Sequence, residues 1–158
     1  MITHIVDNIF IGDWADAERY QKDFETFTLA KESKFVGDHF YPLVDNEDDA
    51  NEYLLSSAIG YIIIKRCNTN HKMLVHCKYG QSRSVAAVLG YMIFYKGCSF
   101  DDAYRHIKNC KRNDNDITLN PYFKKLLWDI EKSGKLYKSP ELLNTECPKL
   151  KIGSFFIG

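Results

Sequence analysis

The sequence lacks a net charge and a long apolar run. Lysine and arginine together number 21, as do aspartate and glutamate, so the formal net charge of the 158 residues is zero. Without a global positive field, the chain is a poor candidate for a general nucleic-acid or anionic-membrane binder. The longest nearly uninterrupted apolar run, residues 85–95, has eleven residues, whereas a membrane-spanning helix needs roughly 20. No stable nucleic-acid partner and no membrane insertion are therefore expected.

The sequence also lacks the cysteine pattern of a disulfide framework or a zinc site. Five cysteines are present, without any C-x-x-C pair: Cys67, Cys77, Cys98, Cys110 and Cys147. An odd, irregularly spaced set argues against both kinds of site, so most of these residues are interpreted as small buried hydrophobic groups. No metal or cofactor is expected. Met1 leads into a polar–apolar alternation instead of a signal peptide, so we expect a soluble, intracellular protein of the cytoplasm, with the nucleus left open.

What the sequence does contain is enough apolar material for one folded domain. Hydrophobic residues make up 45% and aromatic residues 14% of the chain, which supports a packed core and argues against disorder. Repeats, low-complexity tracts and linkers are not evident. We therefore expect a single domain over residues 1–134, with residues 135–158 as a tail that packs on the same domain.

Apolar periodicity predicts strands and helices that alternate along the chain. Strands are predicted at residues 2–12 (two short strands or a hairpin), 24–30, 39–43 and 73–76; helices are predicted at residues 51–66 and 85–95, after a Ser99 cap, and from Pro121 after an Asn120 cap. This interleaving favours an α/β fold, with a central sheet flanked by helices on both faces. In such sheets, ligands bind where strands end and helices begin.

The segment between the strand at 73–76 and the helix at 85–95 carries the chemistry. Cys77 follows the strand and faces the positive end of a helix dipole, which favours its thiolate form. Successive N–H groups of the loop can converge on an anion, and Gly80 lets the backbone approach it. Arg83 adds a planar fork that matches two phosphate oxygens. A thiolate beside a phosphate cradle predicts nucleophilic attack on phosphorus.

The residues around this loop make the pattern specific. A bare C-x5-R pattern arises by chance in about one such chain in four, and the neighbouring His, Gly and Ser lower that frequency by roughly four orders of magnitude. Residues 76–84, HCKYGQSRS, resemble the H-C-x-x-G-x-x-R-S signature of the cysteine-dependent protein tyrosine phosphatases. Residues 9–12 (IFIG), 41–45 (YPLVD) and 120–123 (NPYF) further resemble the small, atypical dual-specificity branch. The likeness covers residues from about 5 to 133.

This resemblance implies a protein-tyrosine-phosphatase-like fold, in which a mostly parallel mixed sheet places a phosphate-binding loop between a central strand and a buried helix. It implies a metal-independent hydrolysis in two steps through a phosphocysteine on Cys77. Ser84 matches the hydroxyl that assists departure of the thiolate, and His76 matches the residue that supports the loop from behind. The implied phosphate-binding residues are Lys78, Tyr79, Gly80, Gln81, Ser82 and Arg83.

An aspartic acid is implied as the general acid that protonates the leaving oxygen. Asp45 lies 32 residues before Cys77, at the end of an apolar strand, and is the leading candidate. Further acidic residues follow it closely, and a loop shift of three residues would bring Asp48 into the same role. Both residues therefore remain candidates.

The resulting functional hypothesis is a dual-specificity-type protein phosphatase that acts on phosphotyrosine, and on phosphoserine or phosphothreonine, in a phosphorylated protein substrate. One alternative keeps the chemistry but takes a phosphoinositide or an RNA 5′-phosphate end as substrate. The other is a pseudophosphatase that binds phosphorylated partners without turnover. The neutral charge argues against the first alternative, and the reactive thiol argues against the second.

Overall fold

The computed structural model of the chain describes residues 2–111, 117–133, 136–137 and 156–157. Its main sheet has five strands in the order β1-β2-β5-β3-β4. The strands are β1 (Thr3–Val6), β2 (Ile9–Gly12), β3 (Glu25–Thr28), β4 (His39–Phe40) and β5 (Met73–His76). β1 runs antiparallel to β2, whereas the other neighbours are parallel. The predicted mostly parallel mixed sheet is thus confirmed.

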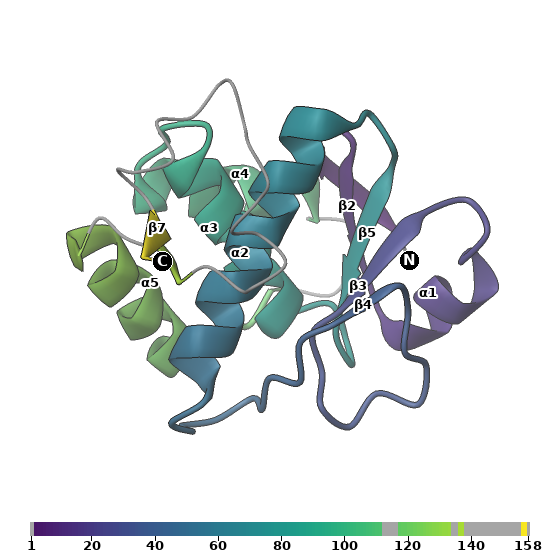
Figure 1. The fold of residues 1–158 in the computed structure, drawn as a ribbon, viewed down its shortest axis with the longest axis horizontal. Helices are drawn as coiled ribbons and strands as arrows, with labels where there is room; N and C mark the ends of the chain where they lie inside the picture. Colours follow the sequence, from purple (N-terminus) through teal and green to yellow (C-terminus); the bar gives the residue numbers. More distant parts are fainter. Residues whose placement is uncertain (1, 112–116, 134–135, 138–155, 158) are drawn as a thin grey trace.

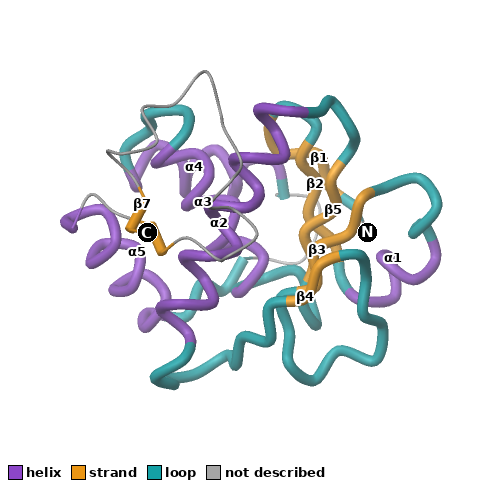
Figure 2. The backbone as a smooth tube through the Cα atoms, viewed as in Figure 1, coloured by secondary structure: helices purple, strands orange, loops and turns teal. Residues whose placement is uncertain are grey.

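Helices cover both faces of this sheet. The helices are α1 (Trp14–Arg19), α2 (Asn51–Asn68), α3 (Arg83–Phe94), α4 (Phe100–Cys110) and α5 (Pro121–Ser133). Figure 1 shows α2, α3, α4 and α5 on one side of the sheet and the short α1 on the other, and Figure 2 shows the strands as a layer between them. The arrangement confirms the predicted α/β class.

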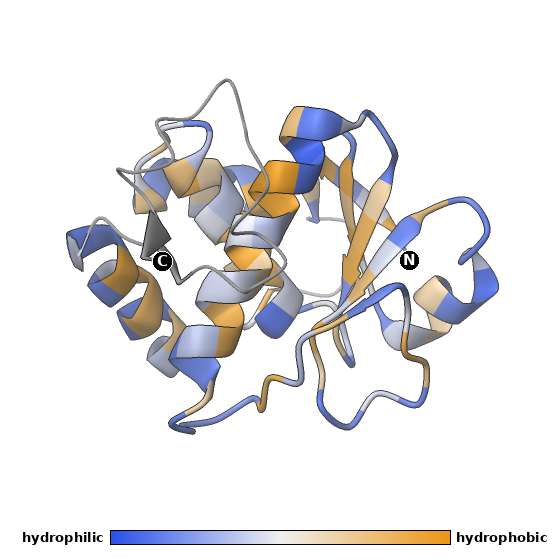
Figure 3. Ribbon diagram, viewed as in Figure 1, coloured by the Kyte–Doolittle hydropathy of each residue, from blue (hydrophilic) through white to orange (hydrophobic). Residues whose placement is uncertain are grey.

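The core lies between the sheet and α3. Every residue of α3 is buried, as its apolar sequence predicts for a helix enclosed on all sides. α2 and α3 both contribute apolar residues to the core, and Figure 3 shows hydrophobic stretches along the ribbon of α2. The two helices approach closely at Gly90, where an added Cβ would lie 2.1 Å from Ile59 Cδ1. α3 is therefore held firmly behind the loop that precedes it.

Two elements differ from their predictions. The strand predicted at residues 39–43 ends at Phe40, and Pro42, two residues on, has no N–H with which to extend a ladder. The helix α1 was not predicted, although its cap is local: Asp16 N–H donates to Asp13 Oδ1 (2.8 Å) and Asp13 N–H to Asp16 Oδ2 (3.3 Å). Two aspartates three residues apart form a reciprocal cap that the sequence alone could have suggested.

The tail is described only at two short strands. β6 (Leu136–Tyr137) pairs in parallel with β7 (Phe156–Ile157), and β6 lies against α2. Residues 138–155 lie outside the described residues, so the packing of the whole tail on the domain stays a prediction. Ser56 and Ser57 of α2 are also buried, so the buried surface of this helix extends beyond the predicted apolar face.

The described residues contain no helix that is long and apolar enough to cross a membrane. Cys77, Cys98 and Cys110 carry free thiols. Cys67 is disulfide-bonded, so the interpretation as a small buried hydrophobic group, made for most of the cysteines, is wrong for this residue. Its spacing from the other cysteines gave no sign of the bond.

Candidate active site

The carboxyl ends of three strands meet beneath the loop that follows β5. β5 lies in the middle of the sheet, and its last residue, His76, is in register with Gly12 of β2 and Thr28 of β3. The next residue is Cys77, and α3 begins at Arg83. The sequence-predicted loop therefore occupies the edge where open α/β sheets bind ligands.

The thiol and the hydroxyl predicted to act together are adjacent. Cys77 is 2% exposed and Ser84 is fully buried, with 3.3 Å between Cys77 Sγ and Ser84 Oγ. Ser84 stands in the first turn of α3, the turn whose N–H groups carry the positive end of the helix dipole. A negative charge on sulfur would therefore receive both a hydrogen bond and a favourable dipole.

Arg83 is buried and is held by Glu32, a residue that the sequence analysis did not indicate. Its Nη1 and Nη2 donate to the two carboxylate oxygens of Glu32 (2.5 and 3.1 Å), and Nη1 also donates to the Leu43 carbonyl (3.0 Å). Hydrogen bonds from Arg83 lower the pKa of Glu32 below its usual value, against the opposing effect of burial. Glu32 belongs to a polar stretch far from the motif in sequence, so only the fold brings the two together.

One nitrogen of the Arg83 guanidinium, the buried Nε, makes no hydrogen bond to the described residues. A buried donor without an acceptor is costly, and in this position it suits an oxygen of a bound anion. The donor set therefore fits a phosphoryl group in the loop.

The loop encloses a small pocket of about 30 Å³. The residues that line it are Asp45, Cys77, Tyr79, Gln81, Ser82, Arg83 and Thr118. Most of the predicted phosphate-binding residues are thus brought together around Cys77. Thr118 is an addition that sequence reasoning missed; its N–H donates to the Gln81 carbonyl (3.1 Å) and ties the segment before α5 to the loop.

Lys78 and Gly80 do not line this pocket. The Lys78 ammonium lies over the rings of Trp14 and Tyr79, 5.7 and 5.1 Å from their centroids. Gly80 has φ +70°, and an added Cβ would lie 2.9 Å from the Gly12 carbonyl oxygen. Gly80 thus serves the turn and its close packing on the end of β2, whereas the Lys78 charge is directed at aromatic faces.

Of the two candidate acids, Asp45 lines the pocket and Asp48 does not. The Asp48 carboxylate accepts the Ala50 N–H (2.9 Å), and its carbonyl accepts the Tyr122 hydroxyl (2.9 Å). Asp48 is therefore engaged in the turn that leads into α2. The geometry favours Asp45 as the proton donor.

Two asparagines hold the loop that carries Asp45. Asn51, buried at the start of α2, exchanges hydrogen bonds with the backbone of Val44 and donates to the Asn46 carbonyl. Asn120 donates through Nδ2 to the Asp45 carbonyl (2.9 Å) and accepts the Tyr122 N–H as a helix cap. The sequence predicted the cap at Asn120 but neither contact with the loop.

His76 lies behind the loop. Its Nε2 is 2.7 Å from Thr28 Oγ1, and the same hydroxyl oxygen accepts the Gly37 N–H (2.8 Å). Burial lowers the pKa of His76 from 6.5 to about 4. The ring is therefore neutral at pH 7, which suits a support for the loop and does not suit a proton carrier.

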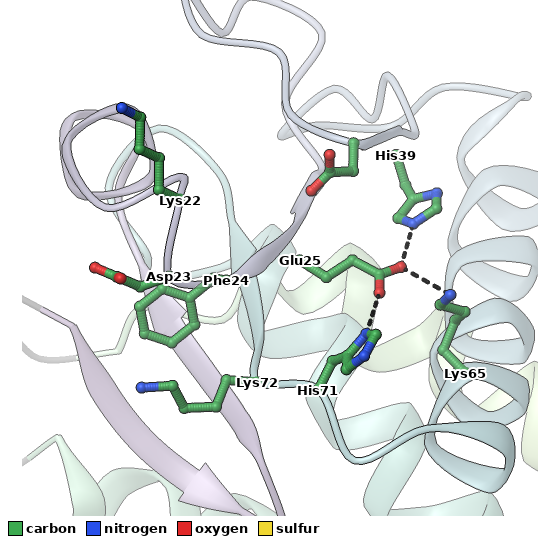
Figure 4. A pocket seen from close by; sticks show the side chains of 9 residues that line it. Lys22, Asp23, Phe24, Glu25, His39, Lys65, His71 and Lys72 are labelled. Carbon is green, nitrogen blue, oxygen red and sulfur yellow. Dashed lines mark hydrogen bonds and ion pairs between the residues drawn. The ribbon is translucent and has the colours of Figure 1, made fainter.

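Another cavity, of about 620 Å³, lies at the opposite ends of the strands (Figure 4). At its centre the Glu25 carboxylate contacts His39 Nε2 (2.5 Å), Lys65 Nζ (3.2 Å) and His71 Nδ1 (3.7 Å). These contacts join β3, β4 and α2. Because Glu25 opens β3, whereas Cys77 follows the carboxyl end of β5, this cluster takes no part in the phosphate pocket.

Comparison with known proteins identifies the family. Residues 16–133 match the family model described as dual specificity phosphatase, catalytic domain. Because this match takes in most of the chain, the chain belongs to the dual specificity phosphatase family. It is a cysteine-based protein phosphatase, and therefore a hydrolase.

Individual relatives agree with this assignment. The chain is 26% identical over 110 residues to 123R of Invertebrate iridescent virus 6, which is named as a tyrosine phosphatase, over 67% of this chain and 77% of that protein. It is 31% identical over 121 residues to human protein phosphatase Slingshot homolog 3, over 69% of this chain but only 18% of that protein.

Solved structures confirm the fold. Human DUSP28 has a TM-score of 0.67 at 19% identity, with 84% of this chain and 93% of that chain covered. DUSP15 has a TM-score of 0.66 at 22% identity, with 82% and 86% covered. The expected phosphatase-like fold is thus confirmed.

Proposed function

We propose that this phosphatase hydrolyses phosphotyrosine, and also phosphoserine and phosphothreonine, in protein substrates through a phosphocysteine intermediate. The observation that carries the proposal is the single small pocket that brings together Cys77, Arg83 and Asp45, with Ser84 Oγ 3.3 Å from the Cys77 sulfur. These groups supply a nucleophile, an anion clamp and a proton donor around one phosphoryl group.

In the first step, the Cys77 thiolate attacks phosphorus and an S–P bond forms. The P–O ester bond breaks, and its electron pair leaves with the substrate oxygen, which takes a proton from the Asp45 carboxyl group. Arg83 Nε and the loop N–H groups hold the equatorial oxygens, where negative charge is concentrated in the transition state. Glu32 keeps the guanidinium in place for this contact.

In the second step, water attacks phosphorus and the S–P bond breaks. The Asp45 carboxylate takes a proton from the water, and sulfur leaves with the bonding electron pair. The Ser84 hydroxyl is placed to donate a hydrogen bond to the departing thiolate. Inorganic phosphate is then released, and the enzyme returns to its starting state without any metal.

The size of the pocket supports dual specificity. The pocket has a volume of only about 30 Å³, whereas a cavity that holds a benzene ring is on the order of 150 Å³. We infer that the pocket takes the phosphoryl group and leaves the rest of the substrate side chain outside. On this proposal, phosphoserine and phosphothreonine reach Cys77 as well as phosphotyrosine does.

The alternatives are less well supported. A phosphoinositide or RNA 5′-phosphate end would favour a basic loop, but Lys78 directs its charge at two aromatic rings and the net charge is zero. A pseudophosphatase has no use for a thiol with a hydroxyl at 3.3 Å. Neither alternative is favoured by the relatives.

The proposal also covers the extent and location of the enzyme. We place the catalytic domain at residues 1–134 and the enzyme in the cytoplasm. Truncation after residue 134 tests the first point, because an intact catalytic domain would retain activity. Immunodetection of the full chain in subcellular fractions tests the cytoplasmic location.

Phosphate release from a matched pair of phosphotyrosyl and phosphothreonyl peptides tests the activity. The wild type is expected to act on both peptides, and Cys77→Ser on neither, because a hydroxyl is a far weaker nucleophile than a thiolate at neutral pH. Activity that survives in folded Cys77→Ser would refute the thiol mechanism. Activity on the phosphotyrosyl peptide alone would refute dual specificity.

A further inference from the structure

Asn51, in the first turn of α2, is fully buried. Its side chain contacts the backbone of the loop that carries Asp45. Its Oδ1 accepts the Val44 N–H (3.1 Å), and its Nδ2 donates to the carbonyls of Val44 (3.0 Å) and Asn46 (2.7 Å). The residue between these two partners is Asp45. The amide of Asn51 thus binds the backbone on both sides of the proposed acid.

Asn51 is the first residue of α2 and follows the N-cap residue Ala50, which makes no side-chain cap. The Asn51 amide contacts the preceding loop, and the Asp48 carboxylate and carbonyl close the turn between the two. A buried amide that satisfies three loop hydrogen bonds specifies the path of that loop.

We propose that Asn51 is the positioning residue of the general acid, which fixes the loop so that the Asp45 carboxyl group meets the leaving oxygen. The inference rests on the proposed function, since it assumes that Asp45 is the acid. Asp45 itself is exposed, so its side chain receives little support from packing. The position of the Asp45 carboxyl group therefore depends on the loop backbone that Asn51 binds and on the contact of Asn120 with the Asp45 carbonyl.

The dependence of the rate on the leaving group distinguishes a misplaced acid from general damage to the fold. An alkyl oxygen, as in phosphothreonine, needs a proton to leave, whereas a fluorinated aryl oxygen leaves readily without one. Asn51→Leu removes the amide at similar volume. It is expected to lower kcat/KM for a phosphothreonyl peptide about 10-fold or more, and to change kcat/KM for a fluorinated umbelliferyl phosphate by less than about 3-fold. kcat/KM is the quantity compared because it reports the first step alone, whereas kcat also includes the second step, in which Asp45 acts as a base for every substrate.

The experiment compares Asn51→Leu with Asp45→Asn, with the double variant and with Asn68→Leu, an asparagine at the far end of α2 that contacts its own helix. The double variant is expected to be no slower than Asp45→Asn alone, because both changes disable the same proton transfer. Hydrogen exchange supplies a readout besides activity. The Val44 amide is expected to lose protection in Asn51→Leu, whereas the β5 amides keep theirs and Asn68→Leu behaves as the wild type.

The outcomes distinguish the inference from the proposed function. If Asp45→Asn shows the leaving-group dependence and Asn51→Leu slows both substrates equally or neither, the inference is overturned and the proposed function stands. If Asp45→Asn shows no such dependence, the assignment of Asp45 fails and the role of Asn51 fails with it. If the wild type releases no phosphate from any substrate, the proposed function itself is refuted.

Discussion

Arg83 depends on Glu32, a residue outside the signature loop. The bidentate contact fixes two of the guanidinium nitrogens, and the buried Nε has no partner among the described residues, which leaves it for the phosphoryl group in the proposed mechanism. The pair also keeps a buried charge from standing alone, which would be strongly unfavourable. The Arg83 guanidinium is thus held in place by the polar stretch after β3.

Glu32→Gln is expected to loosen Arg83 and lower kcat/KM by about 10-fold, because a neutral amide replaces a charge-assisted, two-point contact. Steady-state kinetics with the phosphotyrosyl peptide and binding of orthovanadate measure the effect. Glu18→Gln, at an exposed carboxylate of α1, is the matched control. A Glu32→Gln enzyme with unchanged kcat/KM and vanadate affinity would show that Arg83 needs no such support.

At the scale of elements, the packing of α2 on α3 fixes the start of α3 and with it the phosphate loop. Gly90→Ala would place a Cβ 2.1 Å from Ile59 Cδ1. Overpacking of this kind costs about 1–3 kcal/mol of the free energy of unfolding, even though alanine favours the helix. Urea unfolding monitored by circular dichroism measures the change. A Gly90→Ala variant as stable as the wild type would mean that the helices separate there without cost.

Elements also show what the sequence could and could not predict. The limits of β5 and the caps of α4 and α5 follow from local patterns, because a short apolar run and a cap are encoded within a few residues. The phosphate loop is likewise contiguous, so its signature can be read directly. Glu32 and Thr118 were missed because each meets the loop from a distant segment. Asn51 was missed because its amide serves a loop whose path is set by packing.

At the scale of the whole molecule, the buried His76 makes stability depend on pH. Its pKa falls from 6.5 to about 4 on folding, so between these values the unfolded chain binds a proton that the native protein does not. The contribution of this residue to the free energy of unfolding is therefore fully present above pH 6.5, and it is lost as the pH falls toward 4. The loss amounts to about 3 kcal/mol.

The difference in free energy of unfolding between the wild type and His76→Asn, measured by urea titration from pH 4 to pH 8, isolates this contribution. The wild type is expected to lose stability more steeply than the variant as the pH falls below 6.5. Parallel curves would contradict a neutral, buried His76. The result also bears on the mechanism, since a neutral ring behind Cys77 does not act as a proton carrier.

The central claim is that Cys77 becomes phosphorylated during turnover. The most direct measurement is acid quenching of the enzyme during hydrolysis of a phosphotyrosyl peptide, followed by mass spectrometry of the peptide that contains residues 76–84. We predict one phosphoryl group on Cys77 in the wild type, and more of it in Ser84→Ala, because the second step loses the hydrogen bond to the departing thiolate. Turnover without any phosphoryl group on Cys77, or with one on another residue, would contradict the account.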